Sequence, residues 1–415
     1  MLPFAQVMRK ADANKYYDEK AARSRQRRGS KHGRSRFSRP KWLERGMGLD
    51  LQFLCLVLLL VVIGLVMMFS ASHASAYYNM DGDSYFYIRR QSLFAIGGVV
   101  LMIFISFINY NKLHKLAVPM LIFSYLILIV VLVLPTKGDD PKRWINLGPI
   151  NIQASEITKF AIILFFSHWA SVYYDKMQYA RYSIFPGMVV FGSTAGLLFL
   201  EPHFSGMVII FILTLIMLYE GGMDVKWIFI LLAVIVGAVL IAMPTGILSY
   251  AMKRLGGWGQ ALNPTTNKMW NDTWQTRNSL YAIGSGGLFG LGLGQSREKY
   301  LYIPEPQNDF IFAVVCEEIG LVGALIILII FAWLVWRGIT LSLRAKDRFG
   351  RLLGIGLSAQ IGVQVVLNIL VITDWLPNTG ISLPFFSYGG SSLLMLLAQM
   401  GVVLSISRTA NIEKQ

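Results

Sequence analysis

The chain is divided into ten runs of apolar residues, each close to the roughly 20 residues that a helix needs to cross a bilayer. The runs lie at approximately 51–70, 92–109, 116–135, 154–173, 184–200, 204–221, 227–244, 310–335, 352–374 and 390–407. Charged residues make up only 15% of the chain, against about 25% in ordinary soluble domains. We therefore expect an all-α integral membrane protein with about ten transmembrane helices.

Positive charge is concentrated before the first run. Residues 1–47 hold fourteen Lys and Arg against four Asp and Glu, which is +10 of the chain's net charge of +15. Because cytoplasmic loops carry an excess of Lys and Arg, we expect a disordered cytoplasmic tail at 1–47, a multi-pass membrane domain at 48–408 and a second cytoplasmic tail at 409–415. We interpret the basic tail as a topology anchor and expect no nucleic acid as a partner, because no fold that reads bases accompanies it.

Four cations fall on the side that this topology places outside the membrane. They are Arg89, Arg90, Lys142 and Arg143. Because they run against the charge rule, they are either tolerated or functional. The longest polar interval between apolar runs, from about 249 to 308, lies on the same side. We expect it to form a large extracellular loop over 245–309.

Asp309 stands where an apolar helix begins, directly before FIF at 310–312. Two interpretations are open. Asp is a favoured N-cap residue, so the side chain could simply cap this helix. Alternatively, a carboxylate that the membrane interface partly desolvates is suited to act as a general base. Glu305 and the prolines Pro304 and Pro306, which rigidify the approach to Asp309, favour the second interpretation.

Polar side chains inside the apolar runs need a partner or a purpose, because their burial in a bilayer is costly. Glu156 and Lys159 are three residues apart, so they share a helix face, and they form either a mutually neutralising pair or part of a site. Gln360, Gln364 and Asn368 recur every four residues. Such a stripe either joins helices or lines a cavity.

Two further features lie on either side of Asp309. Glu317 and Glu318 are adjacent, so they cannot both face one neighbour, and we expect at least one of them to cap or brace another segment. The glycine run GSGGLFGLGLG at 284–294 resembles a phosphate loop only weakly, since it lacks the Gly-Lys-Ser/Thr ending. We expect a flexible or close-packed segment at the membrane surface. The sequence has no His/Cys cluster with metal-ligand spacing, so no metal is assigned from it.

Four blocks of the chain resemble the SEDS family (shape, elongation, division and sporulation), whose members polymerise peptidoglycan. The blocks are FSAS at 69–72, RWI with QASE and a lysine over 143–159, NS with the glycine run and LYIPEPQNDFIFAVVCEE over 278–318, and LPFFSYGGSS at 383–392. Within the family, the basic N-terminus and the GLGLG run are most similar to the division branch. The sporulation and elongation branches are the nearest relatives.

The resemblance implies a peptidoglycan glycosyltransferase at the outer face of the bacterial cytoplasmic membrane, acting during cell division. Its substrate would be lipid II, the undecaprenyl-pyrophosphate disaccharide-pentapeptide, and displacement from a pyrophosphate donor predicts inversion. Asp309 would be the catalytic base. The implied substrate-binding residues are Arg143 and Lys159 for the diphosphate, Glu156 to hold Lys159, Glu305, and Ser387, Tyr388, Gly389 and Gly390 on the cavity wall. No cofactor is assigned, and a divalent cation such as Mg²⁺ or Mn²⁺ near Glu305 is the candidate.

The resemblance also implies partners. These are a class B penicillin-binding protein for cross-linking, since no transpeptidase serine motif is present, other divisome proteins and the lipid bilayer. Two departures from the family pattern stand in the chain. Ala154 replaces a proline, and EPH at 201–203 replaces a sequence of the QPD type, so that an acid has become His203. A lipid II flippase and a non-catalytic divisome scaffold are the alternative functions.

Overall fold

Helices form where the apolar runs predict them. The computed structural model describes residues 48–134, 143–146, 151–242 and 257–410, so the tails at 1–47 and 411–415 and the first part of the predicted large loop lie outside the described residues. The helices in the described part are α3 (Leu51–Asn79), α4 (Phe86–Phe107), α5 (Asn111–Val133), α6 (Ala154–Val172), η1 (Tyr174–Lys176), α7 (Ile184–Leu200), α8 (Phe204–Glu220), α9 (Val225–Ala242), α11 (Asn267–Asp272), α12 (Trp274–Ser285), α13 (Ile311–Leu343), α14 (Arg348–Ile372) and α15 (Gly390–Thr409). Two short strands, β1 (Trp144–Asn146) and β2 (Asn151–Gln153), pair antiparallel.

In this part of the chain, ten helices have 17 residues or more, and each overlaps one of the predicted runs. Six of them, α3, α4, α5, α13, α14 and α15, are long and apolar enough to cross a membrane by length and composition. Two others, α7 and α8, are shorter apolar helices. The expected all-α, multi-pass membrane fold is confirmed. The two short helices α11 and α12 lie within the predicted large loop.

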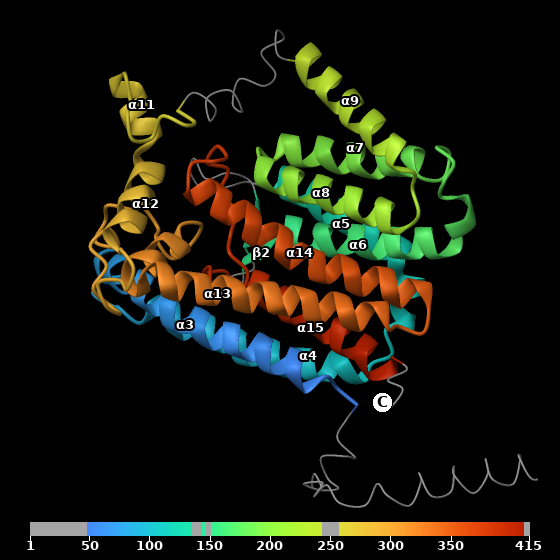
Figure 1. The fold of residues 1–415 in the computed structure, drawn as a ribbon, viewed down its shortest axis with the longest axis horizontal. Coiled ribbons are helices and arrows are strands. Elements are labelled where there is room, and N and C mark those ends of the chain that lie inside the picture. The colour runs from blue at the N-terminus through green and yellow to red at the C-terminus, as the bar shows by residue number, and fades with distance from the viewer. Residues whose placement is uncertain (1–47, 135–142, 147–150, 243–256, 411–415) are drawn as a thin grey trace, which may run out of the picture. The chain divides into compact units, whose positions relative to one another are not determined.

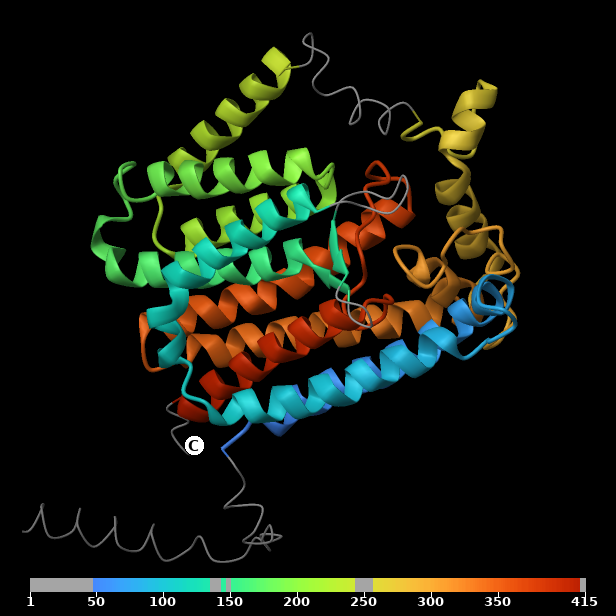
Figure 2. The same cartoon turned by 180° about the vertical axis from the view of Figure 1, so that it is seen from behind.

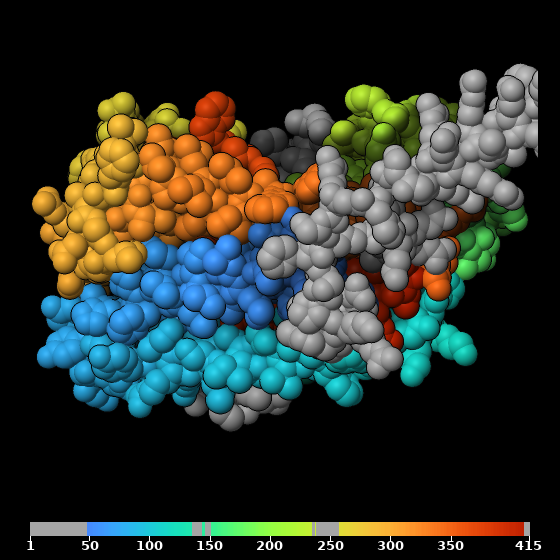
Figure 3. All heavy atoms as spheres, turned by 60° about the horizontal axis from the view of Figure 1, so that its bottom comes forward, coloured from blue at the N-terminus to red at the C-terminus, as the bar shows by residue number. Residues whose placement is uncertain are grey.

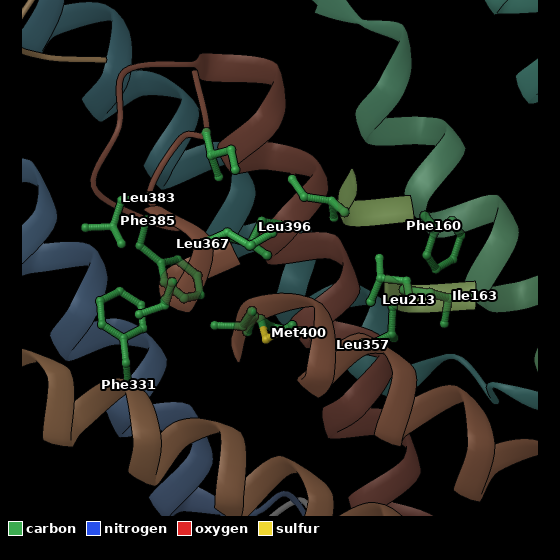
Figure 4. Close-up of a cluster of buried hydrophobic side chains, with 14 of the residues drawn as sticks. Phe160, Ile163, Leu213, Phe331, Leu357, Leu367, Leu383, Phe385, Leu396 and Met400 are labelled. Atoms are coloured by element: carbon green, nitrogen blue, oxygen red, sulfur yellow. The ribbon is translucent and has the colours of Figure 1, made fainter. Parts of the chain in front are cut away.

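Helix α14 lies in the middle of the bundle, where it packs against α13, α6, α8 and α15 (Figure 1, Figure 2). Figure 4 shows apolar side chains from all five helices meeting around it: Leu357 and Leu367 of α14, Phe331 of α13, Phe160 of α6, Leu213 of α8 and Met400 of α15. Leu383 and Phe385 of the loop between α14 and α15 belong to the same buried cluster. The core therefore holds that loop in place.

Small residues allow α4 and α15 to approach closely. A Cβ added to Gly98 of α4 would lie 2.6 Å from Leu397 Cδ1, and one added to Gly401 of α15 would lie 2.6 Å from the Met102 carbonyl oxygen. In a bilayer, helices associate through such close packing rather than through a hydrophobic driving force. Other helix faces are not covered by neighbouring helices. Figure 3 shows one side of the molecule, where α13, α3 and α4 form neighbouring bands. Val62 of α3, Ile96 of α4 and Ile329 of α13 are 58%, 66% and 63% exposed, as lipid-facing side chains are.

One end of the bundle, which we call the basic end, gathers the start of α3, the end of α15 and three loops. The Asp50 N–H donates to Ser407 Oγ at 3.4 Å, and the Asp50 carboxylate pairs with Arg337. Tyr110 donates to Asp347 Oδ1 at 2.6 Å. The two ends of the membrane domain therefore lie on the same side, as an even number of spans requires. The basic segments at 112–115, 176–181 and 337–351, which lie in and between helix ends, belong to this end.

The opposite end, which we call the loop end, carries the glycine run packed against a kink in α13. Gly320 interrupts α13 with φ 70° and ψ −176°, a conformation that favours glycine. A Cβ on Gly290 would lie 2.2 Å from the Glu318 carbonyl oxygen, so backbone meets backbone. Leu291 and Gly292 donate their N–H groups to the carbonyls of Glu317 and Glu318, each at 2.9 Å. The run is thus close-packed, one of the two states expected from the sequence.

Both glutamates of the Glu317-Glu318 pair brace the segment that follows the glycine run. The Glu317 carboxylate accepts from the Arg297 N–H at 2.8 Å and from the Ser296 hydroxyl. The Glu318 carboxylate pairs with Lys299 at 2.9 Å, with 0% and 2% of the two side chains exposed. Together these contacts attach the segment that leads to Asp309 to helix α13. The expectation that at least one of the two braces another segment is confirmed.

Candidate functional site

A cavity of about 700 Å³ opens at the loop end, and we call it the main cavity. Its polar wall comes from the β1–β2 hairpin, the start of α6, the 305–309 segment and the loop between α14 and α15. Its apolar wall comes from membrane helices, through Phe94 of α4, Val131 of α5 and Leu393 and Leu396 of α15. Because the main cavity has one polar wall and one apolar wall, it suits a ligand that carries both a polar head and an apolar tail.

Asp309 lines this cavity from the segment before α13. It does not cap the helix, because α13 begins at Ile311 and its N-cap is Phe310, without a side-chain cap bond; the capping interpretation is wrong. Asn368 Nδ2 donates to the Asp309 carbonyl at 2.8 Å and to the Ile381 carbonyl at 2.6 Å. Asn368, the last member of the polar stripe of α14, therefore ties the start of α13 to the loop that follows α14, whereas Gln364 lines the main cavity.

Gly380 packs directly against the Asp309 carboxylate. A Cβ added to Gly380 would lie 2.8 Å from Asp309 Oδ2, and the glycine has φ +71°. Both the backbone conformation and the lack of space call for glycine here. The position of the Asp309 side chain thus depends on a residue 71 positions further along the chain.

The four residues predicted for the wall from the LPFFSYGGSS block, Ser387 to Gly390, line the main cavity. Ser387 Oγ donates to the Asn308 carbonyl at 2.8 Å, and the Tyr388 N–H donates to the Gln307 carbonyl at 2.8 Å. The block is therefore bonded to the two residues that precede Asp309.

Gln91 of α4 reaches the same block from the other side. Its Nε2 donates to the Ser387 carbonyl at 3.3 Å, and its Oε1 accepts from the Gly389 N–H at 3.2 Å. Gly390 leaves no room for a side chain, because a Cβ there would lie 2.2 Å from the ring of Phe94. Helix α4, which carries Arg90 into the cavity wall, is thus fastened to the LPFFSYGGSS block.

Arg143 lines the cavity from the residue before β1. Its guanidinium donates to the Pro202 carbonyl, in the turn between α7 and α8. In this turn Glu201 is fully buried, and burial raises the pKa of its carboxyl from 4.5 to about 8, although the Arg143 charge acts in the opposite direction. His203 lines the main cavity, whereas Glu201 is not among the residues that line it. The acid of the EPH sequence is therefore buried behind the cavity wall, and Arg143 is held by the Pro202 carbonyl.

Lys159 and Glu156 form the expected pair, with Nζ and Oε1 2.7 Å apart. Glu156 lines the cavity, but Lys159 does not, and only 3% of its side chain is exposed. It lies almost one helical turn further into α6 and points back to Glu156. The cations that line the cavity in the described part of the chain are Arg90 and Arg143, with His203 beside them. The role proposed for Lys159 as a direct diphosphate ligand is not supported by this placement.

A second cavity, of about 320 Å³, adjoins the main one. Arg143, Asp309 and Gly380 line both cavities, so the carboxylate and the guanidinium stand on the boundary between them. The rest of the second cavity is formed by the turn at 257–258, the junction of α11 and α12, and residues 374–379. Two binding volumes that share one carboxylate suit a reaction between two substrates.

Comparison with known proteins identifies the family. The family model described as cell cycle protein, FtsW/RodA/SpoVE, matches residues 50–412. The chain belongs to the FtsW/RodA/SpoVE family. It is 38% identical to stage V sporulation protein E of Bacillus subtilis, over 86% of this chain and 97% of that protein. It is 37% identical to a probable peptidoglycan glycosyltransferase FtsW of Trichlorobacter lovleyi, over 86% of this chain and 93% of that protein.

Solved structures of related proteins have a similar fold. A chain from a structure entitled "Structural coordination of polymerization and crosslinking by a peptidoglycan synthase complex" aligns with a TM-score of 0.69 and 27% identity, over 88% of this chain and 99% of that one. RodA of Thermus thermophilus aligns with a TM-score of 0.63 and 26% identity, over 90% of this chain. The resemblance to the SEDS family that the motifs predicted is therefore confirmed.

Several residues of this FtsW/RodA/SpoVE site were not predicted from the sequence. Gln91, Gly380 and Trp258 carry no local signal, because an isolated glutamine, glycine or tryptophan is common in any chain. Arg90 had a signal, since it violated the charge rule, and the structure places it on the wall of the main cavity. Asn368 was recognised as part of a stripe, but its two acceptors lie on other elements and became apparent only in the fold.

The site does not supply a complete set of metal ligands. Across the described residues, no three His, Cys, Asp or Glu side chains come together in a way that could hold a metal ion. Glu305 lines the main cavity with Asp309, and its Oε2 accepts from Asn308 Nδ2 at 2.6 Å. The divalent cation predicted beside Glu305 therefore stays a prediction, and we assign it no role in the reaction.

Proposed function

We propose that this protein is a peptidoglycan glycosyltransferase that polymerises lipid II during cell division. The observation that carries the proposal is the placement of Asp309 and Arg143 on the shared wall of the two cavities. A glycosyl transfer between two lipid-linked sugars needs a base for the acceptor and a cation for the leaving pyrophosphate at one point. The names of the relatives, probable peptidoglycan glycosyltransferases, support the same activity.

In the proposed reaction, the Asp309 carboxylate takes the proton of the acceptor sugar hydroxyl. The hydroxyl oxygen forms a bond to the anomeric carbon of the donor sugar, and the bond from that carbon to the pyrophosphate oxygen breaks. The electron pair leaves with the undecaprenyl pyrophosphate, whose developing charge Arg143 and Arg90 would stabilise. Attack opposite the leaving group inverts the anomeric centre.

The main cavity has walls for both parts of such a donor. The polyprenyl chain would lie along Phe94, Val131, Leu393 and Leu396, which belong to the membrane helices α4, α5 and α15. The pyrophosphate would lie near the arginines at the polar end. Both cavities are at one end of the bundle, and this placement favours surface chemistry over a transport path through the middle of the membrane. The flippase alternative is therefore less well supported.

The distribution of Lys and Arg predicts the orientation of the protein in the membrane. We infer that the basic end faces the cytoplasm, because Lys and Arg are enriched in cytoplasmic loops. The loop end, with both cavities, would then face the outside of the bacterial cytoplasmic membrane. A class B penicillin-binding protein is the proposed cross-linking partner, since a structural relative comes from a complex that couples polymerization and crosslinking. Other divisome proteins would be further partners.

The test is polymerisation of labelled lipid II by the purified protein with its penicillin-binding partner. Asp309→Asn keeps the shape of the side chain and removes the base, so the rate of glycan formation should fall by about 10²–10⁴-fold. Asp224→Asn, which alters an exposed acid between α8 and α9, is the matched control and should behave as wild type. Equal rates for wild type and Asp309→Asn would refute the assignment of Asp309. Lipid II translocation without polymer would instead favour the flippase.

A further inference from the structure

The second cavity differs from the main cavity in chemistry. Its lining in the described part of the chain is made of Trp258, glycines, threonines, three aspartates, two side-chain amides and Arg143. No aliphatic side chain is among these residues, so a polyprenyl chain finds no apolar surface there. Asp272, Asp309 and Asp374 oppose the single guanidinium of Arg143. This excess of negative charge also disfavours a second pyrophosphate.

The remaining groups suit an uncharged ligand rich in hydroxyls. Asp272 and Asp374 offer acceptors, and Gln275 and Asn378 offer both donors and acceptors. A sugar ring has an apolar face of C–H groups and a rim of hydroxyls, so it can pack on an indole while planar polar groups bond its rim. Trp258 is 46% exposed and provides the one aromatic surface of this cavity among the described residues.

Contacts between three separate segments hold these groups in place. A Cβ on Gly257 would lie 2.5 Å from Thr273 Cγ2, so the turn that carries Trp258 packs closely on the α11–α12 junction. The Ala261 N–H donates to Asp374 Oδ2 at 3.4 Å. Asn378 Nδ2 donates to Gln275 Oε1 at 3.0 Å, which joins the loop after α14 to α12. The cavity is therefore built by tertiary contacts.

We propose that the second cavity is a carbohydrate subsite, which takes the lipid-free sugar part of a substrate with Trp258 as its platform. Its volume, about 320 Å³, is at the lower end of small-molecule pockets. The identity of the sugar rests on the proposed function, and for peptidoglycan it is an N-acetylated disaccharide. A sugar bound here reaches Asp309, which forms part of the same wall. The main cavity retains the lipid and the diphosphate.

A binding experiment without lipid tests this proposal separately from the activity. Saturation-transfer NMR would detect contact between the purified protein and the soluble disaccharide N-acetylglucosaminyl-N-acetylmuramic acid, with its lactyl carboxyl blocked as the methylamide so that the probe is uncharged. Trp258→Ala should weaken the apparent affinity by about tenfold, the change that corresponds to loss of one aromatic contact. Asp272→Asn, which keeps the shape of an exposed side chain, should weaken it to a smaller extent. Trp375→Ala is the matched control, because Trp375 is 73% exposed and lines neither cavity.

Each result decides the matter. A weaker apparent affinity in Trp258→Ala, with the wild-type affinity kept in Trp375→Ala, supports the subsite. Equal transfer in Trp258→Ala and Trp375→Ala would overturn it, as would a wild-type protein that binds the free stem peptide but not the disaccharide. Thermal unfolding of each variant establishes that it is folded. Because no polymer is measured, a failed subsite leaves the polymerase proposal standing, and the Asp309→Asn test can fail without affecting this one.

Discussion

Replacing Gly380 by alanine should impair catalysis while leaving the protein folded. Two effects act at this position. Alanine at φ +71° costs roughly 1–2 kcal/mol, because a Cβ crowds the backbone in the left-handed region. The added Cβ would also lie 2.8 Å from Asp309 Oδ2, whereas ordinary contacts begin at 3.4 Å. One of the two groups must therefore move by about 0.6 Å.

The carboxylate is the group expected to move, because it is the end of a side chain and Gly380 is backbone. A misplacement of about 1 Å at a catalytic group can cost 10²-fold in rate, so we expect kcat for lipid II polymerisation to fall by about 10- to 100-fold. KM should change little, since the residues that line the apolar wall are untouched. The fall should be smaller than that of Asp309→Asn.

Steady-state polymerisation with labelled lipid II measures both constants. Gly294→Ala is the matched control: Gly294 has φ +80°, and nothing lies within 4 Å of its added Cβ. This variant carries the backbone strain without the contact to Asp309, and its kcat should equal that of wild type. If Gly380→Ala and Gly294→Ala had the same kcat, the idea that Gly380 positions the Asp309 carboxylate would be refuted.

Two further predictions concern stability, each measured by thermal or denaturant unfolding in one detergent. Lys299→Met leaves the Glu318 carboxylate buried without its cation, so the free energy of unfolding should fall by about 3–5 kcal/mol. Adding Glu318→Leu to this variant should restore most of the lost stability. A Lys299→Met variant as stable as wild type would contradict the prediction. Burial raises the pKa of Glu201 from 4.5 to about 8, so between these pH values the folded protein holds a proton that the unfolded chain has lost. The contribution of protonated Glu201 to the free energy of unfolding is full below pH 4.5. It declines as the pH rises towards 8 and is lost above that value. Glu201→Gln should remove this part of the pH dependence, and the same slope in wild type and variant would show that Glu201 does not titrate in this window.

Some residues of the site could be predicted from sequence motifs, whereas others could be recognised only from their contacts in the folded structure. Asp309 and the Ser387–Gly390 block were predicted from the sequence, because they stand in distinctive strings, and the structure places them on one cavity wall. Lys159 was predicted from a string as well, but its amino group points back to Glu156. A motif gives a residue's place on a helix, whereas burial and neighbours decide whether its side chain reaches the cavity.

The N-cap interpretation of Asp309 is a second case in which the sequence alone did not predict the surroundings of a side chain. From the sequence, the start of the apolar run at 310 and a preceding Asp fit an N-cap. The helix starts at Ile311 with Phe310 as its N-cap, one residue later than capping by Asp309 requires. Helix boundaries depend on how the chain enters the helix, and here hydrogen bonds from Asn368, Ser387 and Tyr388 hold that entry. None of these partners is near in sequence.

Composition and charge by themselves determined that this is an all-α multi-pass membrane protein, because apolar length and the cost of unpaired backbone in lipid leave few other solutions. The motifs determined the family and pointed to Asp309 as the candidate catalytic acid. Only the tertiary structure decided that Arg90, Gly380 and Trp258 lie around that acid and that it stands between two cavities. The reason is that α4, the loop after α14 and the turn at 257–258 meet through side-chain contacts over hundreds of residues of chain, which no local pattern encodes.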